Sequence, residues 1–118
     1  MNAILLAGGF GSRLRPFTNH VPKCLAPIGG KPLLGYWLDS LLDAGIESVL
    51  INLHYLANQV NEFVSSSPYC NRITLVNEHV LLGTAGTVKQ NSEFFSEERG
   101  LVIHADNFCT ANLAAFID

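Results

Sequence analysis

The first quarter of the chain carries a cluster of glycine and basic residues that could bind an anion. Three glycines follow a short apolar run, and a glycine lacks the Cβ that would keep a ligand away from the backbone N–H groups. Such a turn can form a concave nest of N–H donors. Arginine and lysine side chains come next, so we expect the stretch to wrap a polyphosphate. The residues concerned are Gly8, Gly9, Gly11, Arg13, Arg15 and Lys23.

Two common phosphate-binding patterns do not fit this stretch. The P-loop ends in Gly-Lys-Ser or Gly-Lys-Thr, and neither ending is present here. The dinucleotide fingerprint needs a third small residue after Gly9 and Gly11, but Leu14 occupies that position and no acidic residue follows at the expected distance. A plain tight turn with solvated basic side chains is the alternative interpretation.

Hydrophobic patterning predicts strands and helices in alternation around this turn. Short apolar runs indicate buried strands, and apolar residues at helical spacing indicate helices. The alternation favours an α/β fold with a doubly wound, mainly parallel sheet and helices on both faces. Segment 8–31 is predicted to be a long irregular loop, which usually has a function. The predicted strands are 3–7, 48–53, 73–77 and 101–105, and the predicted helices run from Pro32 to Gly45, over 58–65, over 84–91 and over 112–117.

Candidate site residues follow three of the predicted strands. In a doubly wound sheet, ligands bind over the carboxyl ends of the strands. The glycine turn follows the first strand, Glu78 follows the third and Asp106 follows the fourth. Thr84 opens the next predicted helix directly after Gly83, and its hydroxyl can cap the helix start. We expect these groups to meet at one edge of the sheet.

The motifs together resemble the signature of sugar-1-phosphate nucleotidyltransferases, also called nucleoside-diphosphate-sugar pyrophosphorylases. The resemblance rests on the run from Leu6 to Thr18, on Pro22 to Ile28, on Glu78 with the Leu-Gly-Thr-Ala-Gly motif at 82–86, and on the strand ending at Asp106. It covers nearly all of the chain but only an N-terminal part of the family's catalytic domain. We therefore expect residues 1–118 to be the nucleotide-binding part of an incomplete Rossmann-like nucleotidyltransferase fold.

The resemblance implies a reaction in which an NTP and a sugar 1-phosphate form a nucleotide sugar and pyrophosphate. Phosphoryl-type transfer depends on positioning and charge neutralisation. The resemblance makes Arg13 and Lys23 catalytic, and Asp106 the ligand of Mg²⁺, which prefers oxygen ligands. The 82–86 motif is most like that of mannose and heptose phosphate guanylyltransferases, although uridylyl- and thymidylyltransferases share it. The implied nucleotide-binding residues are Leu6, Ala7, Gly8, Gly9, Gly11, Ser12, Glu78, Gly83 and Thr84.

Each candidate also has a purely structural interpretation. Lys23 could be a solvated loop residue, Asp106 the cap of a turn and Glu78 a solvent-facing strand end. Segment 83–86 could be a plain turn into a helix. The family pair Gly-Asp is replaced here by Ala105-Asp106, so the added methyl group is expected to crowd the nucleotide. Two further residues, His104 and Trp37, are expected in the core.

Composition sets the class of partner. The net charge is −3, which does not indicate nucleic acid. The basic residues nevertheless dominate residues 1–38, which hold four of them and no acidic residue. No apolar run reaches membrane-spanning length, and the N-terminus lacks the pattern of a signal peptide. Three widely spaced cysteines suit a reducing cytoplasm.

The sequence is compatible with two functions. The first is a nucleotidyltransferase, and the alternative is a non-catalytic regulatory or assembly subunit of the same fold. Intact Arg13, Lys23 and Asp106 favour the enzyme. The sequence stops inside a predicted helix, so we expect it to be cut from a longer protein and to have little activity alone. It leaves open whether the protein is a homo-oligomer.

Overall fold

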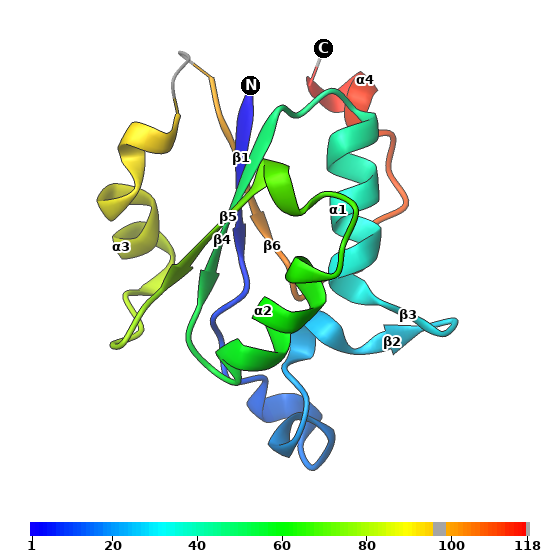
Figure 1. Cartoon of the computed structure of the whole chain (residues 1–118), viewed down its shortest axis with the longest axis vertical. Helices are drawn as coiled ribbons and strands as arrows, with labels where there is room; N and C mark the ends of the chain where they lie inside the picture. The colour runs from blue at the N-terminus through cyan, green and yellow to red at the C-terminus, as the bar shows by residue number, and fades with distance from the viewer. Residues whose placement is uncertain (96–98, 118) are drawn as a thin grey trace.

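A four-stranded parallel sheet forms the centre of the molecule (Figure 1), in a computed structural model that describes residues 1–95 and 99–117. The strand order is β5-β4-β1-β6, so the chain starts in the middle of the sheet and adds strands on both sides. That order is typical of a doubly wound fold. The strands are β1 (Asn2–Leu6), β4 (Ser48–Leu53), β5 (Ile73–Asn77) and β6 (Leu101–His104).

The two central strands are apolar because both of their faces are covered. In β1, Ala3 and Leu5 contribute to the larger core, whereas Ile4 and Leu6 contribute to a smaller core on the opposite face. All four are buried. Strands β5 and β6 lie at the sheet edges and contain only partly buried and exposed residues, which alternate strictly in β6. The predicted strands 48–53 and 73–77 are confirmed at both ends.

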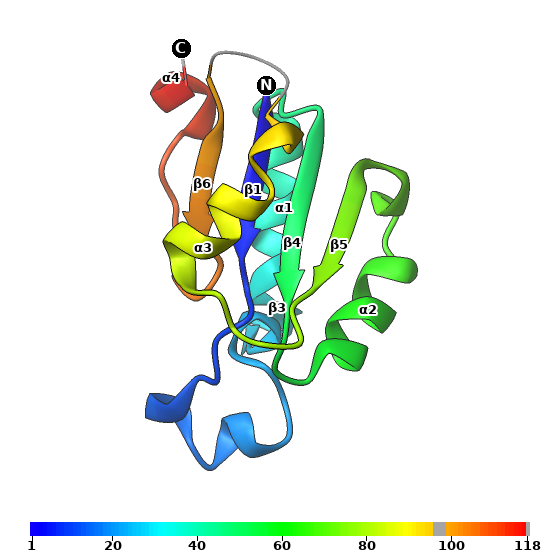
Figure 2. The same ribbon diagram turned by 90° about the vertical axis from the view of Figure 1, so that its left-hand side faces the viewer.

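Helices cover both faces of the sheet, as predicted. Helix α1 (Leu33–Asp43), α2 (Ala57–Ser65) and α4 (Leu113–Ile117) pack on the larger core. Helix α3 (Gly83–Gln90) lies on the opposite face, in front of the strands in Figure 2. Among the described residues, no helix has the length and apolarity needed to cross a membrane.

Helix α1 is the main support of the larger core. It begins after Pro32, and Gly45 follows it with a φ of +94°, a value that glycine adopts without strain. Trp37 lies in the core, as expected, and its indole Nε1 donates a hydrogen bond of 2.6 Å to the Asn107 carbonyl oxygen. This bond ties α1 to the segment that follows β6.

The prediction of an irregular loop over 8–31 is wrong in part. The segment contains three 3₁₀ turns at 12–14, 17–19 and 23–25, followed by a small hairpin of β2 (Pro27–Ile28) and β3 (Lys31–Pro32). Buried Thr18 braces it, because its hydroxyl donates to the Gly11 carbonyl oxygen at 2.6 Å and its own carbonyl accepts from the Tyr55 hydroxyl. Local turn hydrogen bonds of this kind leave no periodic pattern in a sequence.

Three details at element ends are also different from the predictions. Thr84 does not cap α3, which begins one residue earlier at Gly83 and has no side-chain cap. Strand β6 ends at His104, and the Ala105 N–H donates to the Leu6 carbonyl oxygen at 3.0 Å. Helix α4 begins at Leu113, and the Asn112 side chain accepts a hydrogen bond from the Ala115 N–H.

Candidate nucleotide-binding site

A cavity of about 420 Å³ opens at the carboxyl end of the sheet, between the glycine turn and the start of α3. This is the edge at which doubly wound sheets bind ligands. Most of the residues that the sequence singles out are brought together here. The lining residues are Leu6, Ala7, Gly8, Gly9, Gly11, Ser12, Arg13, Lys23, Cys24, Asn52, Leu81, Gly83, Thr84, His104 and Asp106.

The three glycines of the turn have different surroundings. A Cβ on Gly8 would lie 3.0 Å from the Asn52 amide nitrogen, so this position is closely packed. Gly11 has a φ of +64°, and its Cβ would lie 2.8 Å from a Thr18 methyl carbon. Gly9 has no neighbour within 4 Å of such a Cβ. Gly9 is therefore the position where bare backbone faces open space and a ligand could approach.

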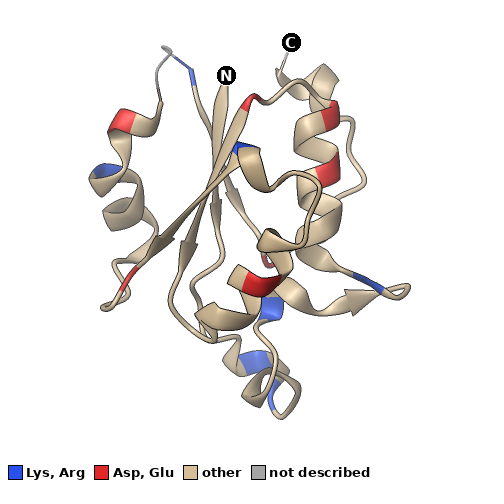
Figure 3. Ribbon diagram, in the orientation of Figure 1, with Lys and Arg blue, Asp and Glu red and all other residues tan. Residues whose placement is uncertain are grey.

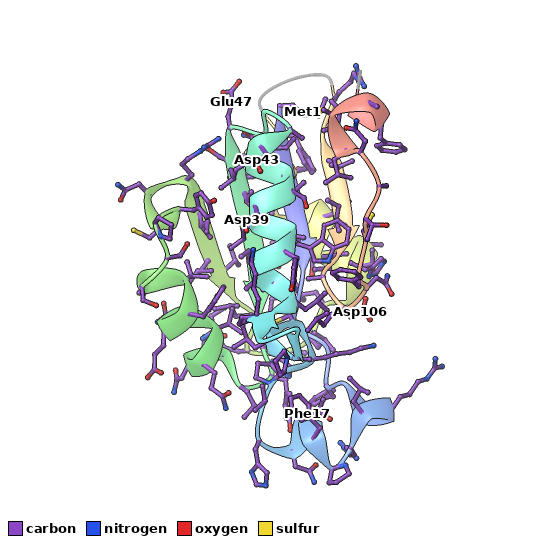
Figure 4. All side chains as sticks on the ribbon, turned by 90° about the vertical axis from the view of Figure 1, so that its right-hand side faces the viewer. Met1, Phe17, Asp39, Asp43, Glu47 and Asp106 are labelled. Carbon is purple, nitrogen blue, oxygen red and sulfur yellow. The ribbon has the colours of Figure 1, made fainter. Side chains whose placement is uncertain are left out.

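A positive and a negative side chain of the cavity lining form an ion pair. Lys23 lies in the 3₁₀ turn at 23–25, and its Nζ is 3.7 Å from Oδ2 of Asp106. Figure 4 labels Asp106 at the lower end of the sheet, above the segment that carries Phe17. Arg13 is exposed and lines the cavity, whereas Arg15 is not among the lining residues. In Figure 3, basic segments gather at this end of the molecule.

The residues around Asp106 fit a magnesium ion that arrives with phosphate. Its side chain is 50% exposed and lines the cavity, so its oxygens can reach a ligand. Magnesium in such sites is held by one or two carboxylates together with substrate phosphates. Among residues 1–95 and 99–117, no group of three or more possible metal ligands is assembled.

Ala105 differs from expectation. It is fully buried in the larger core and is not among the residues that line the cavity. Its methyl group is therefore not part of the cavity surface, which argues against the expected crowding of a nucleotide.

Glu78 lies behind the cavity wall. The side chain is 5% exposed, is not among the lining residues and accepts a hydrogen bond of 2.6 Å from the Thr87 hydroxyl. The interpretation of Glu78 as a solvent-facing strand end is wrong. Gly83 and Thr84 do line the cavity, so the segment after Glu78, rather than its carboxylate, faces the ligand space.

Four lining residues were not singled out as site residues by the sequence: Cys24, Asn52, Leu81 and His104. His104 was expected in the core, but it is exposed. It lies opposite Leu6 at the end of β6, and β6 is an edge strand with only one neighbour in the sheet. Asn52 is buried at the end of the apolar run of β4. The one available signal for Asn52 was a lone amide within an otherwise apolar strand.

Cys24 also lines the cavity, but its thiol is not reactive. Burial raises the pKa of its thiol to about 12, with a smaller opposing effect of a backbone hydrogen bond. The side chain therefore stays protonated at neutral pH, and the reactive form of cysteine, the thiolate, is not available.

Comparison with known proteins identifies the family. The model described as Nucleotidyl transferase matches residues 2–118. The chain belongs to this family. The match confirms the resemblance to sugar-1-phosphate nucleotidyltransferases that the glycine turn and the 82–86 motif indicated.

Named relatives give the range of the similarity. The mannose-1-phosphate guanyltransferase of Schizosaccharomyces pombe is 32% identical over 123 residues, which cover 98% of this chain and 34% of that protein. The N-acetylmuramate alpha-1-phosphate uridylyltransferase of Caulobacter vibrioides is 32% identical over 120 residues, which cover 98% of this chain and 50% of that protein.

A solved structure agrees in fold. HddC from Yersinia pseudotuberculosis, complexed with GMP-PN, superposes with a TM-score of 0.84 at 29% identity and covers 98% of this chain. The matched part is 52% of the HddC chain. The chain thus spans about half the length of these relatives or less.

Proposed function

We propose that this chain supplies the NTP- and Mg²⁺-binding half of a sugar-1-phosphate nucleotidyltransferase. The observation that carries the proposal is the convergence of Gly9, Arg13, Lys23 and Asp106 on one cavity at the carboxyl edge of the sheet. A metal-bound triphosphate needs backbone N–H groups that donate hydrogen bonds, cations that neutralise the phosphates and a carboxylate that binds the metal. This cavity contains groups of all three kinds. A cytoplasmic setting belongs to the proposal, and the free thiols of the three cysteines agree with it.

In the proposed reaction, the phosphate oxygen of the sugar 1-phosphate attacks the α-phosphorus of the NTP in line, and pyrophosphate leaves. Lys23 holds the phosphate where attack occurs, and Arg13 faces the departing pyrophosphate. Bound Mg²⁺ would neutralise phosphate charge and help to orient the triphosphate. Asp106 is the side chain that would hold the ion, and the glycine turn lets the backbone approach the nucleotide.

The relatives include both a guanyltransferase and a uridylyltransferase, so their names do not identify the nucleobase that this chain prefers. A binding experiment has to identify it. We expect GTP to bind best, because the 82–86 motif is most like that of guanylyltransferases. Calorimetry with GTP, UTP, CTP and ATP, each with Mg²⁺, gives the order. Binding of none of the four by the folded chain would overturn the proposed function.

The sharpest test of the backbone contact is Gly9→Val. A Cβ at this position would have no heavy atom within 4 Å outside the neighbouring residues, so the fold should hold and Mg-NTP affinity should fall by roughly tenfold or more. Ala111→Val at an exposed position outside the cavity is the matched control. Unchanged affinity in a folded Gly9→Val variant would remove the glycine turn from the site.

Gly11→Val, by contrast, should act on stability. Its φ of +64° and the approach to Thr18 would strain the turn, at a cost of about 1–3 kcal/mol. Thermal unfolding of the two glycine variants separates ligand exclusion from strain.

A further inference from the structure

A buried chain of hydrogen bonds joins the two walls of the cavity. On one wall, the Ala7 N–H donates to Oδ1 of Asn52 at 2.7 Å. The Asn52 Nδ2 donates to Oε1 of Glu78 at 3.4 Å. On the other wall, the Thr87 hydroxyl donates to Oε2 of Glu78 at 2.6 Å, and the Leu82 N–H donates to Oε1 at 3.3 Å.

The donors and acceptors leave one orientation for the Asn52 amide. A backbone N–H must be matched by the oxygen of the amide, and a carboxylate must be matched by its nitrogen. Asn52 satisfies both, so the chain of bonds has a fixed direction from Ala7 to Glu78. Asn52, Glu78 and Thr87 are 4%, 5% and 0% exposed, which shields these bonds from competing water.

The segment on the far wall is exposed along its length, although Leu81 Cδ1 would lie only 3.2 Å from a Cβ on Gly8. Residues 79–85 are all exposed, and Leu81, Gly83 and Thr84 of this segment line the cavity. Glu78, directly before this segment, is held by two backbone contacts. The Glu78 N–H donates to the Leu53 carbonyl oxygen at 2.7 Å, and the Glu78 carbonyl oxygen lies 2.6 Å from Nδ1 of His54. The Glu78 carboxylate then reaches forward to Leu82 and to α3. In Figure 2 the start of α3 stands beside the ends of the strands.

We propose that Asn52, Glu78 and Thr87 are positioning residues that couple the glycine turn to segment 81–84 and so fix the width of the cavity. The effect on ligand affinity rests on the proposed function, but the coupling itself does not. A buried carboxylate that loses a donor keeps its desolvation cost, so loss of one bond is felt along the whole chain of bonds.

The first test needs no ligand. Hydrogen exchange is measured in Thr87→Val, which removes a hydroxyl on the α3 side, and in Asn52→Leu, which cuts the chain of bonds at β4. Each variant should speed exchange on the opposite wall by roughly tenfold: Thr87→Val at Ala7, and Asn52→Leu at residues 82–87. The control, Thr74→Val, makes the same change at an exposed residue of β5. Exchange that changes only beside the mutated residue would overturn the coupling.

The second test uses Mg-GTP and calorimetry. Glu78→Gln keeps the shape of the side chain and can still accept from Asn52 and Leu82, so we expect an affinity within about threefold of the original chain. Glu78→Ala removes every bond and should weaken binding by roughly tenfold or more at a temperature where the variant is folded. Glu62→Ala, at an exposed position of α2, is the control.

The outcomes separate the two proposals. If the original chain binds no NTP but the crossed exchange response appears, the proposed function fails and the coupling stands. If Mg-GTP binds and Glu78→Ala leaves its affinity unchanged, the positioning role is wrong while the nucleotide site stands. Equal losses in Glu78→Gln and Glu78→Ala would show that charge, rather than the hydrogen-bonded geometry, is what matters.

Discussion

At the scale of single residues, side chains of the same type have different roles because their surroundings differ. Arg13 lines the cavity and Arg15, two residues later, does not. Lys23 faces Asp106, whereas Lys31 pairs with Asp39 away from the cavity. Of these four cations, only Arg13 and Lys23 line the cavity, and they are the two that the family resemblance makes catalytic.

Arg13→Ala should lower kcat more than it weakens NTP binding. Negative charge grows on the departing pyrophosphate as its bond to the α-phosphorus breaks, so a nearby guanidinium gains most in the transition state. Loss of one such donor typically lowers kcat by about 10²–10³-fold. Steady-state pyrophosphate release is measured on a version of the protein that also carries the sugar-binding half, alongside NTP Kd. Arg13→Lys tests geometry, since a lysine offers a point charge in place of a planar fork. A kcat held within about threefold with a sharply raised Kd would make Arg13 a binding residue.

At the scale of elements, a cluster of polar side chains links β3, α1 and the segment after α2, away from the cavity. Lys31 in β3 pairs with Asp39 in α1, and the Tyr69 hydroxyl donates to the other Asp39 oxygen at 2.8 Å. The Lys31 ammonium also lies 4.7 Å from the centre of the Tyr36 ring. Figure 4 labels Asp39 midway along α1. The hydrogen bond from Lys31, helped by that from Tyr69, lowers the pKa of Asp39 against the opposing effect of desolvation.

This cluster predicts a pH dependence of stability. Because the pKa of Asp39 is lower in the folded chain, its contribution is complete above the ordinary value of about 3.9 and is lost as the pH falls below it. Asp39→Asn should therefore lower the Tm at pH 6, and the difference from the original chain should shrink towards pH 3. The effect should be modest, since both side chains are partly exposed. Asp43→Asn, at an exposed position on the same helix, is the control. A Tm difference that stays constant from pH 6 to pH 3 would contradict the assignment.

The elements themselves were largely predictable, but the contacts between them were not. Strands 48–53 and 73–77 stand out as apolar runs between turn residues, so local patterning finds them. The burial of Glu78 and the exposure of His104 depend on register and on which strand lies at an edge, and one sequence does not reveal either. The glycine turn was recognisable because its motif is local. Asn52 was missed because its partners, Ala7 and Glu78, are distant in sequence.

At the scale of the whole molecule, the cavity lies at one edge of the sheet. The chain spans only part of the length of its relatives. Relatives extend well beyond the matched region. We predict that the 118-residue chain binds Mg-NTP but shows little or no transfer to any sugar 1-phosphate. Calorimetry and a pyrophosphate-release assay on the same preparation test both halves of this statement. Efficient turnover would show that residues 1–118 already contain the acceptor site.

The hydrogen bond from Trp37 to Asn107 has an optical consequence. Trp37 is the single tryptophan of the sequence, and it is buried, so the emission of the chain comes from one defined environment. Its indole N–H is bonded to the carbonyl of the residue directly after Asp106. Any shift of that segment when a ligand reaches Asp106 changes the polarity and hydrogen bonding around the indole. The protein thus contains its own fluorescent probe, hydrogen-bonded to the residue after Asp106 and requiring no label.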